Sequence, residues 1–238
     1  MTHTMNDFIV ALNTNKISAR ELVENCLAAI DNPEGEGQRA FISTYHDRAQ
    51  QQADMVDQAR KRGWGVPKFA GIPLSIKDLF DEAGFVTKAG STVLRAATPA
   101  IQDASVVARL KAAGFIVIGR TNMTEFAFSG LGTNVHYGTP RSPYERDPKN
   151  PEIGRVAGGS SSGSAVSISD RMAVATIGSD TGGSTRAPAA FCGIVGFKPT
   201  TNRMPSHGIF PLSTSFDAAG PMGTTVGCLL YTSDAADE

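Results

Sequence analysis

Two glycine-serine turns constrain the fold of this chain more than any other feature. The first is GGSSSGS at residues 158–164, and the second is DTGGS at residues 180–184. Between them, AVSIS has the pattern of a short helix and MAVATIG that of a buried strand. Adjacent glycines permit positive φ and close approach of backbone to a ligand. The segment therefore predicts two hydroxyl-rich turns that flank one helix and one strand.

The N-terminal region, about residues 1–65, predicts helices that serve packing. Ser18 with Glu21 three residues later forms a capping box, and apolar residues at helical spacing follow through residue 30. A second helix is expected over residues 47–62, with Gly63 available to end it.

A strand, a helix and a second strand are expected downstream. Residues 72–76 read as a short strand, and residues 115–118 as another. We expect Asp103 to cap the helix between them and Gly114 to end it. This order predicts an α/β sheet. Four prolines predict a long surface loop over residues 138–154: Pro140, Pro143, Pro148 and Pro151.

The composition argues against several classes of partner. The 22 basic and 23 acidic residues nearly cancel, so nothing predicts binding to a nucleic-acid backbone. No apolar run has the length of a membrane span, and the N-terminus lacks the pattern of a secretory signal. We therefore expect a cytoplasmic protein with one sizeable core, since 41% of its residues are hydrophobic.

The cysteines and histidines predict no metal site and no disulfide framework. Their spacing matches no metal motif, and we expect the cysteines to be core thiols: Cys26, Cys192 and Cys228. The histidines are isolated from one another: His3, His46, His136 and His207.

The second turn has the chemistry of a serine nucleophile. Gly182 and Gly183 precede Ser184 and can direct backbone N–H groups into one hollow, as an oxyanion hole requires. Without a neighbouring histidine, lysine is a candidate base, and Lys77 ends an apolar strand. Burial would lower its pKa enough to accept a proton. A serine of the run 160–162 can bridge lysine and nucleophile.

Other interpretations of these residues remain open at this point. Glycine-serine runs are often linkers, and Lys77 beside Asp78 is often a solvated ion pair. The run GSSSG matches a nucleophile elbow centred on Ser161, with Asp180 and His207 following in order. Cys192 is an alternative nucleophile. GGSSSGS lacks the residue order of a phosphate-binding loop.

From GIPLSIKD to GFKPT the chain resembles the amidase signature family. The specific part is GGSSSGSAVSISDRMAVATIGSDTGGSTRAPAAFCGIVGFKPT. The resemblance implies an α/β amidase signature fold, with a mixed central β-sheet covered by α-helices, incomplete here. It also implies a Ser–cis-Ser–Lys triad in which Ser184 is the nucleophile, Ser160 the cis-peptide serine and Lys77 the base.

The resemblance assigns further residues around the triad. It places the oxyanion hole on the backbone amides of Thr181, Gly182, Gly183 and Ser184. Supporting positions fall on Ser161, Asp180 and Arg186. The implied reaction passes through an acyl-enzyme and needs no metal or organic cofactor.

Two departures from the family pattern bear on substrate and partners. Ser162 stands where glycine is common, and Ala187 stands where the glutaminase subunits of tRNA-dependent amidotransferases usually have glutamine. This favours a stand-alone amidase for a small-molecule amide, for which a homodimer is one option, over a glutaminase subunit with partner subunits. A homologue without turnover is the remaining alternative.

The domain prediction is a single amidase domain over residues 1–227, with its catalytic core over about 66–227. Residues 228–238 can be back-translated into the transposase adapter used in short-read sequencing. We therefore expect a non-native tail there, and sequencing reads across residue 227 test this. Family members are also about twice as long as this chain.

Overall fold

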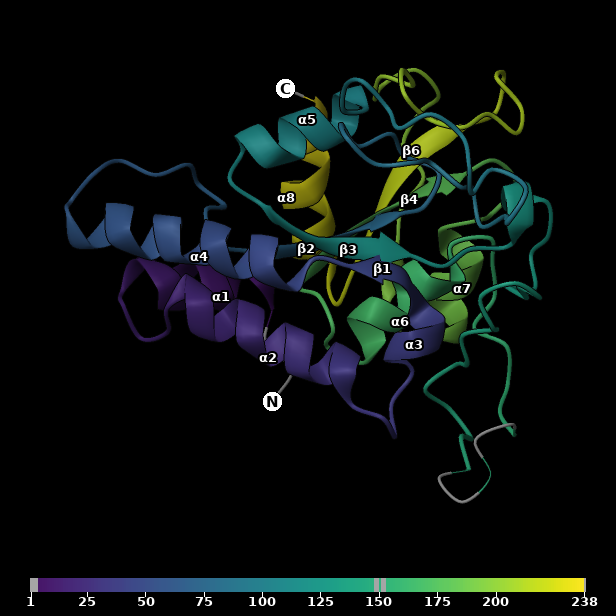
Figure 1. The fold of residues 1–238 in the computed structure, drawn as a ribbon, viewed down its shortest axis with the longest axis horizontal. Helices are drawn as coiled ribbons and strands as arrows, with labels where there is room; N and C mark the ends of the chain where they lie inside the picture. Colours follow the sequence, from purple (N-terminus) through teal and green to yellow (C-terminus); the bar gives the residue numbers. More distant parts are fainter. Residues whose placement is uncertain (1–3, 148–149, 151–152, 238) are drawn as a thin grey trace.

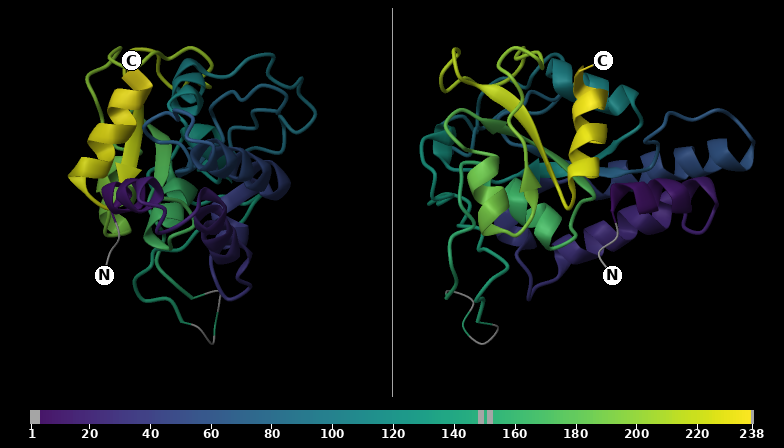
Figure 2. Two further views of the ribbon diagram at one scale, coloured as in Figure 1. Left: turned by 90° about the vertical axis from the view of Figure 1, so that its left-hand side faces the viewer. Right: turned by 180° about the vertical axis from the view of Figure 1, so that it is seen from behind.

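A mixed six-stranded sheet with helices on both faces forms the core of the protein (Figures 1 and 2). The computed structural model describes residues 4–147, 150 and 153–237. Helices α5 and α8 pack together on one side of the sheet, while α6 packs against four strands from the other side. This arrangement confirms the α/β fold with a mixed sheet that the sequence predicts.

The sheet has the strand order β1-β3-β2-β4-β6-β5. Strand β2 is parallel to both β3 and β4, whereas the pairs β1–β3, β4–β6 and β5–β6 are antiparallel. The strands are β1 (Phe41–Thr44), β2 (Pro73–Lys77), β3 (Ile116–Thr121), β4 (Ala175–Asp180), β5 (Val195–Gly196) and β6 (Ala218–Gly223).

The helices account for most of the remaining regular structure. None of the helices among the described residues is long and apolar enough to cross a membrane. They are α1 (Met5–Asn13), α2 (Ala19–Asp31), α3 (Gly37–Ala40), α4 (His46–Lys61), α5 (Ser105–Ala112), the 3₁₀ helix η1 (Glu125–Ala127), α6 (Ser162–Ser169), α7 (Arg186–Phe191) and α8 (Val226–Asp237).

The N-terminal helices form largely as the sequence predicts. The Ser18 side chain accepts the Glu21 amide and the Glu21 carboxylate accepts the Ser18 amide, which is the expected capping box. Gly63 follows α4 with φ of 70°. The region also contains a strand that we did not predict, because β1 joins the sheet edge beside β3.

One expected cap is wrong. Asp103 does not cap α5, whose preceding residue is Ala104 with no side-chain cap. Its carboxylate instead accepts the amide of Ala83 at 2.9 Å and pairs with Lys111 at 2.9 Å. Asp103 therefore links the loop at Ala83 to Lys111 of α5. The predicted loop over 138–154 has no helix or strand among its described residues, and Pro148 and Pro151 lie outside them.

Buried hydroxyl groups join β2 to the helix behind it. Ser75 lies 2.9 Å from Ser167 of α6 and donates to Thr176 of β4 at 2.7 Å. Gly163 allows α6 to lie close to α3, since a Cβ there would lie 2.2 Å from the Ala40 carbonyl oxygen. Side chains alternate along a strand, so Lys77 points to the same face as Ser75.

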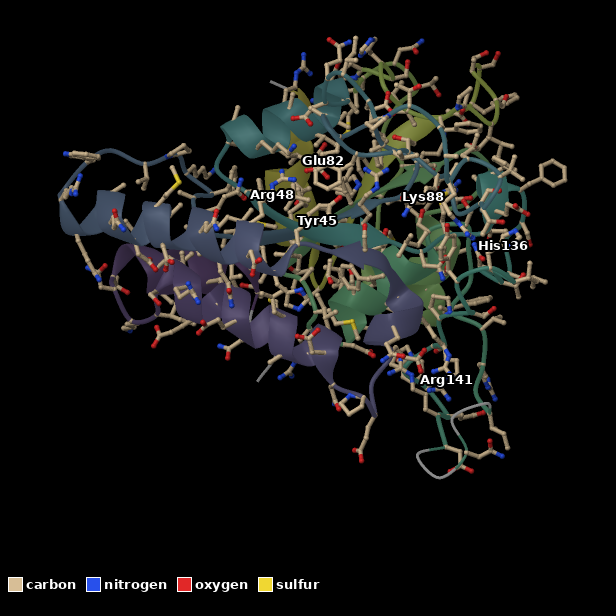
Figure 3. The ribbon with its side chains drawn as sticks, viewed as in Figure 1. Tyr45, Arg48, Glu82, Lys88, His136 and Arg141 are labelled. Atoms are coloured by element: carbon tan, nitrogen blue, oxygen red, sulfur yellow. The ribbon has the colours of Figure 1, made fainter. Side chains whose placement is uncertain are left out.

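A buried ion pair fixes the residue that follows Lys77. Arg120 donates to the Asp78 carboxylate at 2.8 Å, and the Gly90 amide donates to its other oxygen at 3.0 Å. A second charged group lies nearer the α4 side, where buried Glu82 pairs with Arg48 at 2.7 Å (Figure 3). Charged side chains thus organise the region around the end of β2.

We predict that Asp78→Asn destabilises the protein by about 3 kcal/mol, because Arg120 then remains buried without a counterion. Denaturant unfolding at neutral pH measures the change in the free energy of unfolding. Glu145→Gln is the matched control, since Glu145 and Arg155 form an exposed pair that contributes less than about 1 kcal/mol. Equal losses in the two variants would contradict the prediction.

Candidate active site

Lys77 is fully buried at the end of β2 and pairs with no carboxylate of the described residues. Its Nζ donates to Ser160 Oγ at 2.7 Å and to Ser179 Oγ at 2.9 Å. Burial lowers the pKa of Lys77 to about 7, against the opposing charges of Asp180 and Asp217. Asp78 pairs with Arg120, so the interpretation of Lys77 and Asp78 as a solvated ion pair is wrong.

Ser160 lies directly over Lys77 on the first glycine-serine turn. The peptide bond between Gly159 and Ser160 is cis, as the family resemblance implies. The Thr124 amide donates to the Ser160 carbonyl at 3.0 Å, and the Gly159 amide donates to Gly130 at 2.8 Å. Hydrogen bonds therefore fix the backbone on both sides of the Ser160 peptide. They keep the Ser160 hydroxyl within hydrogen-bonding distance of Lys77.

Ser184 ends the second turn and reaches solvent, with 9% of its surface exposed. Its carbonyl accepts the Ser161 amide at 3.2 Å, which joins the two turns. Its hydroxyl forms no hydrogen bond among the described residues. The structure thus brings Lys77 and Ser160 into contact and places Ser184 beside them through the backbone. Catalytic hydrogen bonds often tighten only when substrate binds.

The Asp180 carboxylate shapes the second turn. It accepts the Gly183 amide at 2.8 Å, the Thr185 hydroxyl at 2.9 Å and two Arg186 N–H groups at 3.0 Å. Although burial opposes its ionisation, hydrogen bonds from Arg186 and Thr185 hold the pKa of Asp180 well below its usual range. Asp180 is therefore an anion that stabilises the turn by accepting hydrogen bonds from its residues.

Of the four amides expected to form the oxyanion hole, that of Gly183 donates to the Asp180 carboxylate at 2.8 Å. The amides of Thr181, Gly182 and Ser184 are the remaining candidates. A Cβ on Gly182 or Gly183 would meet no atom within 4 Å, so the turn borders open space.

Ser161 supports the turns and does not fit the elbow interpretation. It is fully buried, its hydroxyl donates to the Ser179 carbonyl at 3.3 Å, and loop rather than strand precedes it. His207 contacts Gln102 at 3.2 Å instead of Ser161. A nucleophile elbow needs an exposed serine directly after a strand. The elbow prediction is wrong for this structure.

The cysteines are buried free thiols, as expected. Burial raises the pKa of Cys192 to about 12, so its thiol is protonated at neutral pH and the nucleophile interpretation of Cys192 fails. His46 contacts Asp31 and His136 contacts Glu125, while His3 lies outside the described residues. Within the described part of the chain, no group of three or more His, Cys, Asp or Glu side chains is arranged to hold a metal.

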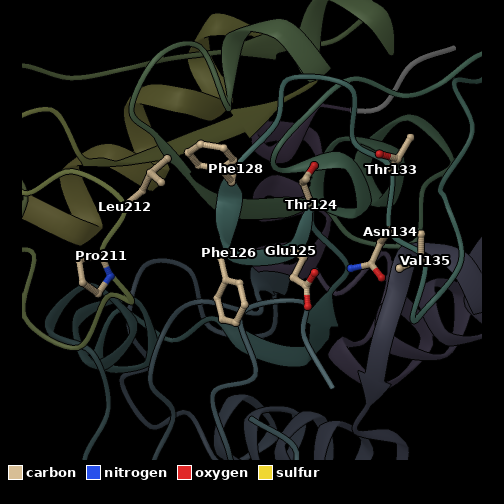
Figure 4. Close-up of a pocket in the computed structure, with 9 residues that line it drawn as sticks. All are labelled: Thr124, Glu125, Phe126, Phe128, Thr133, Asn134, Val135, Pro211 and Leu212. Carbon is tan, nitrogen blue, oxygen red and sulfur yellow. The ribbon is translucent and has the colours of Figure 1, made fainter. Parts of the chain in front are cut away.

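A cavity of about 650 Å³ lies next to η1 and was not predicted (Figure 4). Its walls come from the segment after β3 and from residues 211–212. Polar residues after a parallel strand are a signal for such a site, and NMTEF follows β3 directly. The lining residues are Thr124, Glu125, Phe126, Phe128, Thr133, Asn134, Val135, Pro211 and Leu212.

Comparison with known proteins places this geometry in context. The family model described as Amidase matches residues 21–237. AtzE of Pseudomonas sp. (strain ADP), which is a 1-carboxybiuret hydrolase subunit, is 40% identical over 229 residues, which are 96% of this chain and 48% of that protein. A glutamyl-tRNA(Gln) amidotransferase subunit of Synechococcus sp. (strain WH7803) is 41% identical over 90% of this chain and 42% of its own length.

A solved structure agrees with these matches. The native peptide amidase from Stenotrophomonas maltophilia superimposes with a TM-score of 0.86 at 34% identity, over 98% of this chain and 47% of that protein. The chain therefore spans about half the length of the relatives that it matches.

We predict that Lys77→Met is more stable than wild type at pH 7, and that this difference in stability decreases as the pH rises. The folded pKa of about 7 lies below the ordinary value of 10.5, so the unfolded chain binds more protons between these values. Wild type therefore gains stability as the pH rises through this interval. The difference between the variants should shrink by about 2 kcal/mol from pH 7 to pH 9.

Denaturant unfolding at each pH measures this difference. Lys16→Met is the control, because Lys16 is exposed and its replacement should add no slope with pH. A Lys77→Met difference that does not change with pH would show that Lys77 is protonated in the folded state.

Proposed function

The chain belongs to the amidase family, and we propose that it hydrolyses carboxylic amide C–N bonds through an acyl-enzyme on Ser184. The observation that carries this proposal is the contact of 2.7 Å between the buried Lys77 amine and Ser160. A lysine with a pKa near 7 is neutral in about half of the molecules at pH 7 and can accept a proton.

The proposed reaction moves protons along one chain of hydroxyls. Neutral Lys77 takes the proton of Ser160 while Ser160 takes that of Ser184, and Ser184 Oγ attacks the amide carbon. The tetrahedral intermediate collapses as the same chain delivers a proton to the departing nitrogen. Water then attacks the ester, gives its proton to the chain and releases the acid. Each residue ends in its starting protonation state.

Backbone N–H groups of the second turn stabilise the oxygen of the tetrahedral intermediate in this proposal. Thr181, Gly182 and Ser184 supply the candidate donors, since the Gly183 amide is bound to Asp180. One such donor contributes about 10²–10³ in rate in a serine protease. The Asp180–Arg186 pair keeps the turn in shape without taking part in proton transfer.

The cavity is our candidate for the substrate site. Thr124 connects its wall to the Ser160 carbonyl through a backbone hydrogen bond of 3.0 Å. Phe126, Phe128 and Leu212 provide apolar surface, while Glu125 and Asn134 add polar groups. A small-molecule amide with an apolar part fits this lining.

A glutaminase subunit is the second candidate function, because the Synechococcus relative belongs to a glutamyl-tRNA(Gln) amidotransferase. Such a subunit would act with partner subunits and release ammonia from glutamine. Ala187 at the position usually held by glutamine in those subunits favours the stand-alone amidase, which we propose to be a cytoplasmic homodimer. Glutamine hydrolysis that requires an added partner would support the second candidate.

We predict that a fluorophosphonate probe labels Ser184 of the protein in its full encoded form. The labelling rate should rise with pH through about 7, because neutral Lys77 is the base. Ser184→Ala should abolish labelling, and Lys77→Ala should slow it by about 10²–10⁴. Peptide mapping by mass spectrometry locates the label.

Ser206→Ala is the matched control, since Ser206 is an exposed loop serine and its loss should change nothing. Label on Ser161, or no label on a protein that circular dichroism shows to be folded, would contradict the proposed mechanism. The second result would favour a homologue without turnover.

A further inference from the structure

Asp217 lies where three segments around the proposed active site meet. It directly precedes β6, whose first residue Ala218 pairs with Asp180 at the end of β4. It also ends the loop that carries Pro211 and Leu212, which line the cavity. The carboxylate is half-buried between the second turn and this loop. Neither the triad nor the oxyanion hole includes it.

Each oxygen of the Asp217 carboxylate binds a different segment. One oxygen accepts the Thr181 hydroxyl in a short hydrogen bond. The other accepts the backbone amides of Leu212 at 2.9 Å and Ser213 at 3.0 Å. Hydrogen bonds to a carboxylate are about twice as strong as those between neutral groups. Asp217 thus connects a candidate oxyanion residue to a wall of the cavity.

Lys198 makes a second connection between the same segments. Its Nζ donates to the Asp180 carbonyl at 2.8 Å and to the Phe216 carbonyl at 2.5 Å. The end of β4 and the residue before Asp217 are therefore held at a fixed separation. Two independent side chains, one anionic and one cationic, maintain the same junction.

We propose that Asp217 is a positioning residue. It holds the oxyanion turn at Thr181 against the loop that forms one wall of the substrate cavity. This inference rests on the proposed function. The role of Asp217 is distinct from that of Asp180, which shapes the turn from within. Asp217 acts between the turn and the substrate site.

The charge of Asp217 also acts on Lys77. The groups that face Lys77 directly are the hydroxyls of Ser160 and Ser179. Asp180 at the end of β4 and Asp217 just before β6 favour its protonated form. Arg186 pairs with the Asp180 carboxylate, Lys198 donates to the Asp180 carbonyl, and Asp78 is paired with Arg120. Removing the Asp217 charge should therefore lower the pKa of Lys77.

Labelling rates between pH 5.5 and 9 test this inference. Thr181→Val removes one arm of the junction and keeps the charge, so labelling should slow about tenfold with an unchanged pH dependence. Thr181→Ser should restore the rate to within about twofold. Asp217→Asn should slow labelling at least as much and move the rise in rate to lower pH. Glu34→Gln, which removes an exposed carboxylate between α2 and α3, should change neither.

A Thr181→Val protein or an Asp217→Asn protein that labels at the wild-type rate would overturn the inference. A second measurement needs no reaction. The stability difference between Asp217→Asn and Asp217→Asn/Lys77→Met should begin to change at a lower pH than the same difference in wild type. Absence of labelling in every protein, wild type included, would contradict the proposed function, whereas equal labelling rates in wild type and Thr181→Val would contradict this inference alone.

Discussion

The arrangement of this site depends on the burial of Lys77 away from water and from any ion pair with the described carboxylates. Lys77 reaches a pKa near 7 because it is buried and because its neighbours are hydroxyl groups. Asp78 is the next residue in the chain, and Asp180 favours the protonated form of Lys77 by its charge; either would hold Lys77 as a cation if it paired with it. Each has an arginine instead. The two ion pairs therefore protect the neutral state of Lys77.

Hydroxyl groups replace apolar packing on the face of the sheet that carries Lys77. Ser75 contacts Ser167 of α6, and Thr121 lies 2.6 Å from Ser164 of the same helix. Hydrogen bonds have stricter geometry than apolar contacts, so they fix the height and rotation of α6 over β2. The first turn immediately precedes α6. The position of Ser160 over Lys77 thus follows from the hydroxyl contacts made one and two turns further along the helix.

The sequence predicts the helices and strands of this fold better than it predicts which groups bind to one another between them. Local signals suffice for the Ser18 cap and for the strand that ends at Lys77, because capping and alternation act over a few residues. The sequence position of Asp103 suits a cap, whereas its carboxylate binds Ala83, twenty residues away. The same limit applies to Gly183, whose amide binds Asp180, and to Asp217. Their roles depend on contacts that only the closed sheet creates.

The cavity is connected to the two turns by different means. Its wall after β3 reaches the first turn through the Thr124 amide and the Ser160 carbonyl, a backbone contact that any residue except proline at position 124 can make. Its other wall reaches the second turn through side chains, those of Asp217 and Thr181. Substitutions along the wall after β3 can therefore change the shape of the cavity while Ser160 stays in place. Substitution of Asp217 or Thr181 acts on the cavity and on the oxyanion turn together, so we infer that substrate preference varies more freely at positions that contribute only backbone groups to these contacts.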